Sequence, residues 1–434
     1  MDDLLYARSL MGLSLAFHIV FAAVGVAMPL FMALAEWRWY RTGDRVFLEL
    51  ARKWAKGTAI LFAVGAVSGT VISFELGLLW PGFMRFAGAL IGMPFSLEGF
   101  AFFTEAIFLG IYLYGWDKVS PRLHLASAFI VAASGAASAF FVTLANAWMN
   151  VPAGFQLASG APTNIDPLAA LFPPGWAREV VHVLLSSYVA TAFIVAAIHA
   201  RALLRAPSSR FHRAALAIAL SVAATTALLQ PLSGDVSARG VAENQPIKLA
   251  ALEGQFKTEA GAPLRIGGLP DEAARRTPGA IEIPHGLSLL AFHDWKATVK
   301  GLDDYPRRDW PKVAWVHVAF QIMVGCGMLL AAVSLIAVVL RLRGHGLPLQ
   351  RWFLWAVVLA GPLGFIALEA GWMVTELGRQ PYVVHGALRT SEVVTAVRGL
   401  ALPFWAFTAL YLFLAFAVFV LLRRQLAAPV EEHA

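Results

Sequence analysis

The chain has 434 residues, of which 59% are hydrophobic and 14% charged, with a formal net charge of +7. This composition excludes a soluble enzyme, because many of its apolar runs exceed the roughly 20 residues that a helix needs to cross a bilayer. The Lys and Arg residues are scattered over short connections between these runs, so they indicate membrane orientation and argue against nucleic acid as a partner.

Hydropathy predicts about nine membrane-spanning helices along the chain. Their expected ranges, in chain order, are 10–36, 54–74, 96–115, 122–146, 178–200, 213–232, 312–340, 352–374 and 400–422. Basic residues gather after every second span, beginning with the first, and the other short connections carry few. The positive-inside rule therefore predicts an N-terminus outside and a C-terminus in the cytoplasm. The fold class is an all-α, polytopic membrane helix bundle.

One connection, residues 233–311, is far longer and more polar than the others, and we expect it on the outer face. Long loops largely escape the charge rule, and a loop of this length is more often functional than idle. The sequence thus divides into six spans in residues 1–232, an outer loop in 233–311, and three spans in 312–434. We find no internal repeat in it.

A pair of acids, Glu98 and Glu105, is the most informative motif, because both lie inside the apolar stretch FSLEGFAFFTEAIFLGIYLYGW. Seven residues make two helical turns, so both carboxyl groups are expected on one face, about 10 Å apart along the axis. Ionisable groups within a span are costly and usually point into a protein interior, a relay or a cofactor.

Four other side chains in apolar spans have the chemistry of haem ligands: His18, His182, Met323 and Glu369. Counted along the predicted spans, these four and the two acids all fall in the outer half of the membrane, with the acids opening the third span. Taken singly, an intramembrane His is as readily a hydrogen-bonding group between helices, and a Met is usually core filler. Their shared depth favours haem ligation with proton delivery.

Several segments resemble subunit I of the cytochrome bd quinol oxidases, including their cyanide-insensitive branch with a short quinol loop. The matching segments, in family order, are AFHIVFA, FSLEGFAFFTEAIFLGIYLYGWD, LANAWMNVPAG, the region around His182, KLAALE, QIMVGCG and ALEAGWMVTELGRQPY. The resemblance implies an electrogenic quinol:oxygen oxidoreductase of the bacterial cytoplasmic (inner) membrane that does not pump protons. Its cofactors would be two haem b groups and one haem d, or a further haem b in place of haem d.

The same resemblance implies partners for the chain. These are a second membrane subunit (subunit II), ubiquinol or menaquinol as electron donor, and oxygen as acceptor. A small single-helix subunit is compatible with the family, and no nucleic acid is expected.

Roles for individual residues also follow from the resemblance. His182 and Met323 match the axial pair of the low-spin haem b, a ligation that suits electron transfer. His18 and Glu369 match the ligands of the remaining two haems, with either residue holding either haem.

Residues near those ligands match as well. Glu98 and Glu105 match acids beside the haem pair, with Glu105 on a proton path from the cytoplasm, and Ser138 matches a polar position along it. Trp372 and Arg379 match residues that hold haem edges or propionates.

Lys248 and Glu253, in KLAALE, match the family's quinol-binding loop, where an acid–base pair would accept or orient the quinol hydroxyls. Without the resemblance, this segment is predicted to be an exposed amphipathic helix. Two positions depart from the family pattern: Gln321 stands where an Arg often precedes the Met ligand by two residues, and Tyr382 replaces the Trp of GRQPW. Loss of that Arg charge is expected to alter the haem potential.

Two alternatives stay open. A haem b subunit would pass quinol electrons to another acceptor, although pure electron transfer needs no open iron site of the kind that His18 and Glu369 suggest. A proton-coupled transporter would use Glu98 and Glu105 as its binding pair and would contain repeats and helices broken at the midplane.

Overall fold

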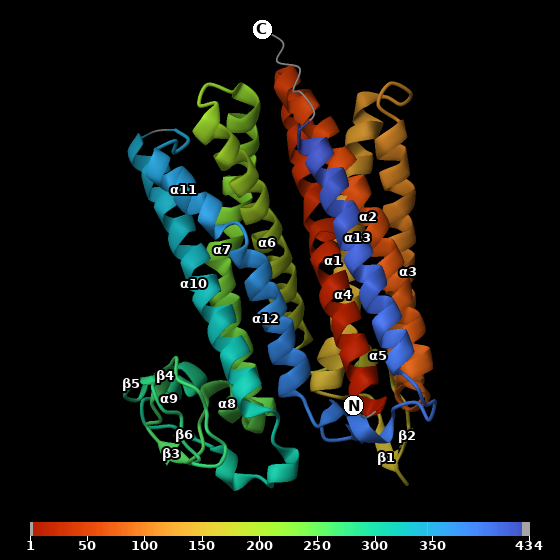
Figure 1. Cartoon of the computed structure of the whole chain (residues 1–434), viewed down its shortest axis with the longest axis vertical. Coiled ribbons are helices and arrows are strands. Elements are labelled where there is room, and N and C mark those ends of the chain that lie inside the picture. The colour runs from red at the N-terminus through yellow and green to blue at the C-terminus, as the bar shows by residue number, and fades with distance from the viewer. Residues whose placement is uncertain (1–2, 345, 428–434) are drawn as a thin grey trace.

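The computed structural model describes residues 3–344 and 346–427, and within these ranges nine helices are long and apolar enough to cross a membrane. This finding confirms the predicted number of spans. The long helices run along one axis, and the long polar connection lies at the same end as the start of the first helix (Figure 1). We call this the loop end and the opposite end the distal end.

Four long helices from the first part of the chain form one group, on the right in Figure 1, against which the last helix packs. They are α1 (Asp3–Thr42), α2 (Arg45–Leu79), α3 (Pro81–Tyr114), α4 (Pro121–Asn150) and the last helix, α13 (Ala401–Ala427). Side-chain caps begin two of these helices: Asp44 accepts from the backbone N–H of Val46, and Ser120 accepts from that of Leu123. Such caps satisfy N–H groups that a helix start leaves unpaired.

A second group, on the left in Figure 1, contains α6 (Trp176–Arg205), α7 (Arg210–Asn244), α10 (Val313–Gly344), α11 (Arg351–Ala360) and α12 (Leu363–Gly378). The two groups meet where α1 and α4 pack against α6, and where α1 touches α12. Short α5 (Pro167–Leu171) packs against α3 and α4 at the loop end. Candidate ligands on α1, α6 and α12 are therefore on helices that contact one another, and α10 contacts α12.

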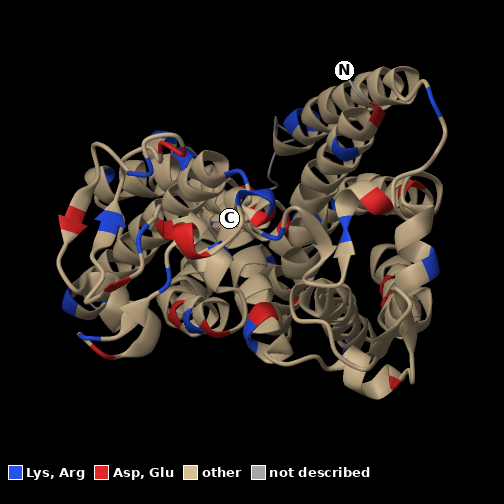
Figure 2. Ribbon diagram, turned by 90° about the horizontal axis from the view of Figure 1, so that it is seen from below, with Lys and Arg blue, Asp and Glu red and all other residues tan. Residues whose placement is uncertain are grey.

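The loop end carries short elements, of which the sequence indicated only a helix at KLAALE. Two are the helices α8 (Pro246–Glu253) and α9 (Gly286–Phe292), and three are the 3₁₀ turns η1 (Leu302–Asp304), η2 (Arg307–Asp309) and η3 (Thr390–Glu392). The strands pair antiparallel as β1 (Gln156–Ala158) with β2 (Ala161–Thr163), β3 (Glu259–Ala260) with β6 (Thr298–Val299), β4 (Leu264–Ile266) with β5 (Ile281–Ile283), and β7 (Tyr382–Val384) with β8 (Leu388–Arg389). Figure 2 shows basic and acidic residues mixed over this end, without one basic patch.

Two predicted boundaries are wrong by several turns. Helix α3 begins at Pro81, not near residue 96, because Pro81 occupies the first helical turn, where it is tolerated, and the helix continues through Pro94. Helix α7 continues to Asn244, so the long connection begins after that residue and not at residue 233. Polar residues at the end of α7 had lowered its hydropathy without ending the helix.

The predicted span 352–374 corresponds to Arg351–Gly378, one of the nine candidate spans, but its helix is not continuous. It is interrupted at Gly361 and Pro362, between α11 and α12. Pro362 has no backbone N–H to donate and its ring clashes with the preceding turn, which explains the break. Gly364 then brings α12 close to α6, since a Cβ built on it would lie 2.5 Å from the Cα of Ala190.

Candidate functional site

The two intramembrane acids lie deeper than predicted. Helix α3 starts 17 residues before Glu98, which corresponds to about 26 Å from the loop end. Glu105 is only nine residues from the last residue of α3, Tyr114, and so lies nearer the distal end. The six candidates therefore do not all share the loop-end half of the bundle, because the third span is longer than its hydropathy indicated.

Glu98 and Glu105 do face the same neighbour, as their spacing predicted. Ser138 Oγ, on α4, donates to Glu98 Oε1 over 3.0 Å. One turn away on the same helix, a Cβ added to Gly135 would lie 3.2 Å from Glu105 Oε1. Glu105 is 5% exposed, so its carboxyl is held between two helices.

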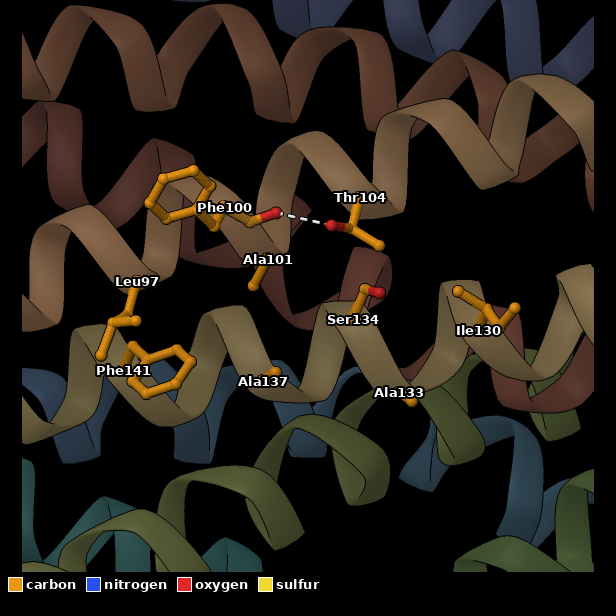
Figure 3. Close-up of a pocket in the computed structure, with 9 residues that line it drawn as sticks. All are labelled: Leu97, Phe100, Ala101, Thr104, Ile130, Ala133, Ser134, Ala137 and Phe141. Carbon is orange, nitrogen blue, oxygen red and sulfur yellow. Dashed lines mark hydrogen bonds between the residues drawn. The ribbon is translucent and has the colours of Figure 1, made fainter.

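An apolar groove runs between α3 and α4 alongside these acids (Figure 3). Its lining residues are Leu97, Phe100, Ala101, Thr104, Ile130, Ala133, Ser134, Ala137 and Phe141. Thr104 Oγ1 donates to the backbone carbonyl of Phe100 over 2.8 Å, which satisfies its hydroxyl within α3. Neither Glu98 nor Glu105 lines the groove, so the acids and the groove are separate features of this helix pair.

His18 and His182 lie on different helix pairs but have the same kind of partner. His18 Nδ1, on α1, is 3.0 Å from Ser68 Oγ on α2. His182 Nδ1, on α6, is 3.0 Å from Ser233 Oγ on α7. Each imidazole is thus anchored through Nδ1 by a serine of the next helix in the chain.

Met323 lies at the contact between α10 and α12, and Glu369 is carried by α12. A Cβ added to Gly371 would lie 3.1 Å from Met323 Sδ, so α12 leaves room for the thioether. Two residues earlier on α12, Glu369 Oε1 is buried without a hydrogen-bond partner in the described part of the chain. A buried carboxyl oxygen without a partner is costly, so this atom is available to a ligand.

These donors do not gather into a site for a bare metal ion. No three His, Cys, Asp or Glu side chains of residues 3–344 and 346–427 converge in that way. Haem iron takes only one or two ligands from the protein, because the macrocycle supplies the other four. Donors held one or two at a time on contacting helices match that requirement.

A buried charged cluster lies at the loop end of α12. Arg379, which is 2% exposed, donates through Nη2 to Glu376 Oε2 over 2.6 Å, while its Nε and Nη1 have no partner among the described residues. Asn146 Nδ2 on α4 donates to the other oxygen of Glu376 over 2.8 Å. Trp372, one turn before Glu376, packs against a small buried cluster of Ala23, Ala190 and Leu368. Arg379 therefore offers two unpaired donors to an anion.

Lys248 and Glu253 are both buried on α8, so the exposed amphipathic helix predicted without the resemblance is wrong. Burial lowers the pKa of Lys248 to about 8, with Glu179 opposing that shift and Arg379 adding to it. Burial also raises the pKa of Glu253 to about 8, against the opposing effect of Arg265. Five residues of a helix turn the chain by about 140°, so the two side chains have different faces and different neighbours. They do not form one contacting acid–base pair.

The two positions that depart from the family pattern both have structural partners. Gln321 Oε1 accepts from the backbone N–H of Gly267 over 3.1 Å, and its Nε2 donates to the carbonyl of Arg265 over 3.1 Å. Tyr382 OH donates to Asp309 Oδ1 over 3.4 Å, and the guanidinium carbon of Arg389 lies 4.9 Å from the Tyr382 ring centroid. Gln321 thus ties α10 to the long connection, and Tyr382 joins a polar contact that a Trp lacks the hydroxyl to make.

Sequence reasoning missed two further buried acids. Glu75 on α2 accepts from Ser14 Oγ over 2.7 Å, and Tyr411 OH donates to the same serine over 2.9 Å. The position of Glu75 in the apolar segment VISFELGLL was the signal that could have identified it. It was overlooked because it falls beyond the end predicted for the second span.

The other missed acid is Glu36, which is fully buried near the distal end of α1. Its Oε1 lies 2.7 Å from Nδ1 of His124, whose Nε2 lies 2.9 Å from the carbonyl oxygen of Tyr112. Glu36 Oε2 and the Tyr112 hydroxyl are buried without a partner in the described part of the chain. Glu36 is the last residue of the first predicted span, 10–36, and this position was the available signal.

Comparisons with known proteins agree on one family. A family model described as cytochrome bd terminal oxidase subunit I matches residues 6–430. The chain is 42% identical to a Bacillus subtilis protein named "Putative cytochrome bd menaquinol oxidase subunit I", covering 100% of this chain and 98% of that one. It is 31% identical to the cytochrome bd-II ubiquinol oxidase subunit 1 of Escherichia coli, over 89% and 88% of the two chains. The solved bd oxidase of Geobacillus thermodenitrificans superposes with a TM-score of 0.91 at 40% identity, over 98% of each chain.

Proposed function

The chain belongs to the cytochrome bd terminal oxidase subunit I family, and from this premise we propose how its residues serve the oxidation of quinol by oxygen. A bd-type subunit I is a multi-pass membrane protein of an oxygen-reducing quinol oxidase. We place it in the bacterial cytoplasmic (inner) membrane with the loop end outside, because basic residues gather in the distal connections.

His182 and Met323 would hold the iron of the electron-transferring haem b, and His18 and Glu369 would hold the irons of the other two haems. The set would be two haem b and one haem d, or haem b throughout. When bound, these groups carry electrons from quinol and reduce oxygen to water. The observation that carries the assignment is the unpartnered, buried Glu369 Oε1 on the helix that makes room for the Met323 thioether.

Arg379 and Trp372 are proposed to hold the periphery of a haem. The free Nε and Nη1 of Arg379 suit a propionate, because a guanidinium binds carboxylates through paired N–H donors. Trp372 lies on the same helix, two turns before Arg379, where its ring can pack on a haem edge.

Protons for oxygen reduction are proposed to come from the distal side through Glu105. This carboxyl lies between α3 and α4, closer to the distal end than Glu98, and Ser138 is hydrogen-bonded to Glu98 one step further toward the loop end. Glu105, Glu98 and Ser138 can thus hold protons in sequence. Uptake from the cytoplasm and release of quinol protons outside would make the reaction electrogenic without a pump.

Quinol is proposed to bind at the long connection near α8. Glu253 is buried with one unpartnered oxygen, Oε2, which can accept a quinol hydroxyl proton. Lys248 faces the charged cluster around Arg379, so its part would be electrostatic and would not involve pairing with Glu253. Either ubiquinol or menaquinol fits this chemistry.

The proposed assembly contains subunit II, and a small single-helix subunit is compatible with it. We propose that the chain divides functionally into three parts, first set at residues 1–232, 233–311 and 312–434. The boundary between the first two parts moves to Asn244, where α7 ends. Neither alternative function is favoured: the broken α11–α12 span is a feature expected of transporters, but the family match extends over nearly the whole chain.

A reduced-minus-oxidised visible spectrum of the purified complex, repeated with carbon monoxide, tests this proposal. A haem b band with a far-red band that shifts with carbon monoxide supports an oxidase with haem d. Haem b bands that respond to carbon monoxide support haem b throughout. Haem b bands that do not respond to carbon monoxide favour the alternative of a haem b subunit that passes quinol electrons to another acceptor. Folded protein without haem overturns the proposed ligand set.

A further inference from the structure

The serine that contacts His18 decides which nitrogen of the imidazole is free. Ser68 Oγ lies within hydrogen-bonding distance of two backbone carbonyls of its own helix, with Val64 O at 2.9 Å and Gly65 O at 3.1 Å. A hydroxyl has only one hydrogen, so when Ser68 donates it to either carbonyl, its Oγ accepts from His18 Nδ1, 3.0 Å away. In that arrangement Nδ1 carries the proton, and Nε2 keeps its lone pair.

The same reasoning applies to His182. Ser233 Oγ donates to the carbonyl of Gln230 over 2.9 Å, so it accepts from His182 Nδ1 at 3.0 Å. The Gln230 Nε2 amide lies 3.3 Å from Nδ1 and 3.2 Å from Nε2, so this contact does not distinguish the two nitrogens. With Nδ1 donating to Ser233, Nε2 is the nitrogen that carries the lone pair.

These two arrangements resemble each other locally. Ser68 and Gly69 begin SGTV on α2, and Ser233 and Gly234 begin SGDV on α7. Helix α1 packs against α2 and supplies His18, 50 residues before Ser68. Helix α6 packs against α7 in the same way and supplies His182, 51 residues before Ser233. In both cases the glycine faces the imidazole: a Cβ would lie 2.9 Å from His18 Cε1 or 3.6 Å from His182 Cε1.

We propose that Ser68 and Ser233 are positioning residues that fix the orientation and tautomer of two haem-ligating histidines. This inference rests on the proposed function, since it takes His18 and His182 to be ligands. Each serine would accept the Nδ1–H, so that Nε2 would be the nitrogen that binds the iron. A ligating histidine whose other nitrogen donates to an acceptor is a stronger electron donor to the metal, which favours the oxidised iron.

The test uses Ser68→Ala and Ser233→Ala in the purified complete oxidase, with visible spectra and a redox titration of each haem as readouts. We expect each variant to shift the band and raise the midpoint potential of its own haem only. Ser68→Thr and Ser233→Thr should restore both, because a threonine hydroxyl can make the same bonds. The matched controls are Ser73→Ala and Ser237→Ala, whose hydroxyls donate only to carbonyls of their own helices.

Gly69 and Gly234 give an independent check, because only a Cβ at Gly69 would come too close to its histidine ring. Gly69→Ala should disturb the haem at His18, whereas Gly234→Ala should leave the haem at His182 unchanged. Unchanged potentials in both serine variants would overturn the inference, as would equal shifts in the control variants.

His18→Ala and His182→Ala separate this inference from the proposed function. If neither removes a haem, the ligand assignment itself fails. If each removes one haem while the serine variants retain normal bands and potentials, only the positioning role is wrong.

Discussion

At the residue scale, the carboxyl of Glu105 gives the sharpest test of proton delivery. Glu105→Gln keeps the shape of the side chain beside Gly135 but cannot carry a proton. We expect oxygen consumption to slow by about 100-fold, the usual order for loss of an acid–base group, with normal haem spectra. Thr104→Val, which changes the adjacent side chain facing the groove, serves as the control (Figure 3). Near-normal turnover in Glu105→Gln would remove this residue from the path.

A pH profile tests Glu253 as the acceptor of a quinol proton. Burial raises the pKa of this carboxyl to about 8, so it is largely protonated at pH 7 and must ionise before it can accept. The rate of quinol oxidation should therefore rise from pH 7 to 9 in the wild type. Glu253→Gln should be slow with no such rise. The exposed Glu243→Gln is the control, and a rise that persists in Glu253→Gln would assign it to another group.

At the scale of elements, the contact between α12 and α6 is predicted to be sensitive to volume. A side chain at Gly364 meets the backbone of Ala190 at 2.5 Å, so Gly364→Val forces the helices apart. We expect a loss of stability of about 1–3 kcal/mol, together with weaker haem retention because α12 carries Glu369. Gly327→Val on α10, where a Cβ would meet nothing within 4 Å, is the matched control.

The measurements are the thermal denaturation midpoint of the solubilised complex and its haem-to-protein ratio. Equal values for the two glycine variants would show that the close approach of α12 and α6 contributes little. Pro362, which ends α11, lies near this contact, so the broken span and the tight packing affect the same part of the bundle.

At the scale of the whole molecule, the long connection is held to the bundle by a few polar contacts. Gln321 binds the backbone of Gly267 and Arg265, and His317 on the same helix lies 2.7 Å from the carbonyl oxygen of Leu252. Gln321→Ala removes two hydrogen bonds, each worth about 0.5–1.5 kcal/mol. We expect a raised KM for quinol and faster tryptic cleavage at the exposed Arg275.

Gln425→Ala is the control for that variant, because Gln425 makes its hydrogen bond to the carbonyl of Lys53, away from the long connection. If Gln321→Ala leaves KM and cleavage unchanged but shifts a haem potential, the residue acts on the haem electrostatically, as the departure from Arg first suggested.

The sequence by itself determined the class of molecule, the number of spans and most of the candidate site. Hydropathy reports the cost of burying backbone and charge in lipid, which depends on composition and needs no contact information. For the same reason, Glu98, Glu105, His18, His182, Met323 and Glu369 stood out as ionisable or ligand-like groups in apolar runs.

Only the tertiary structure decided where those residues lie and what they touch. The extra turns of α3 and α7 are polar or proline-containing, and long-range packing stabilises them where local hydropathy does not. The pairing of His18 with Ser68 and of His182 with Ser233 joins residues about 50 positions apart, and the burial of Lys248 and Glu253 depends on what covers α8. Such contacts depend on how separate helices approach one another, which the pattern within a single helix does not contain.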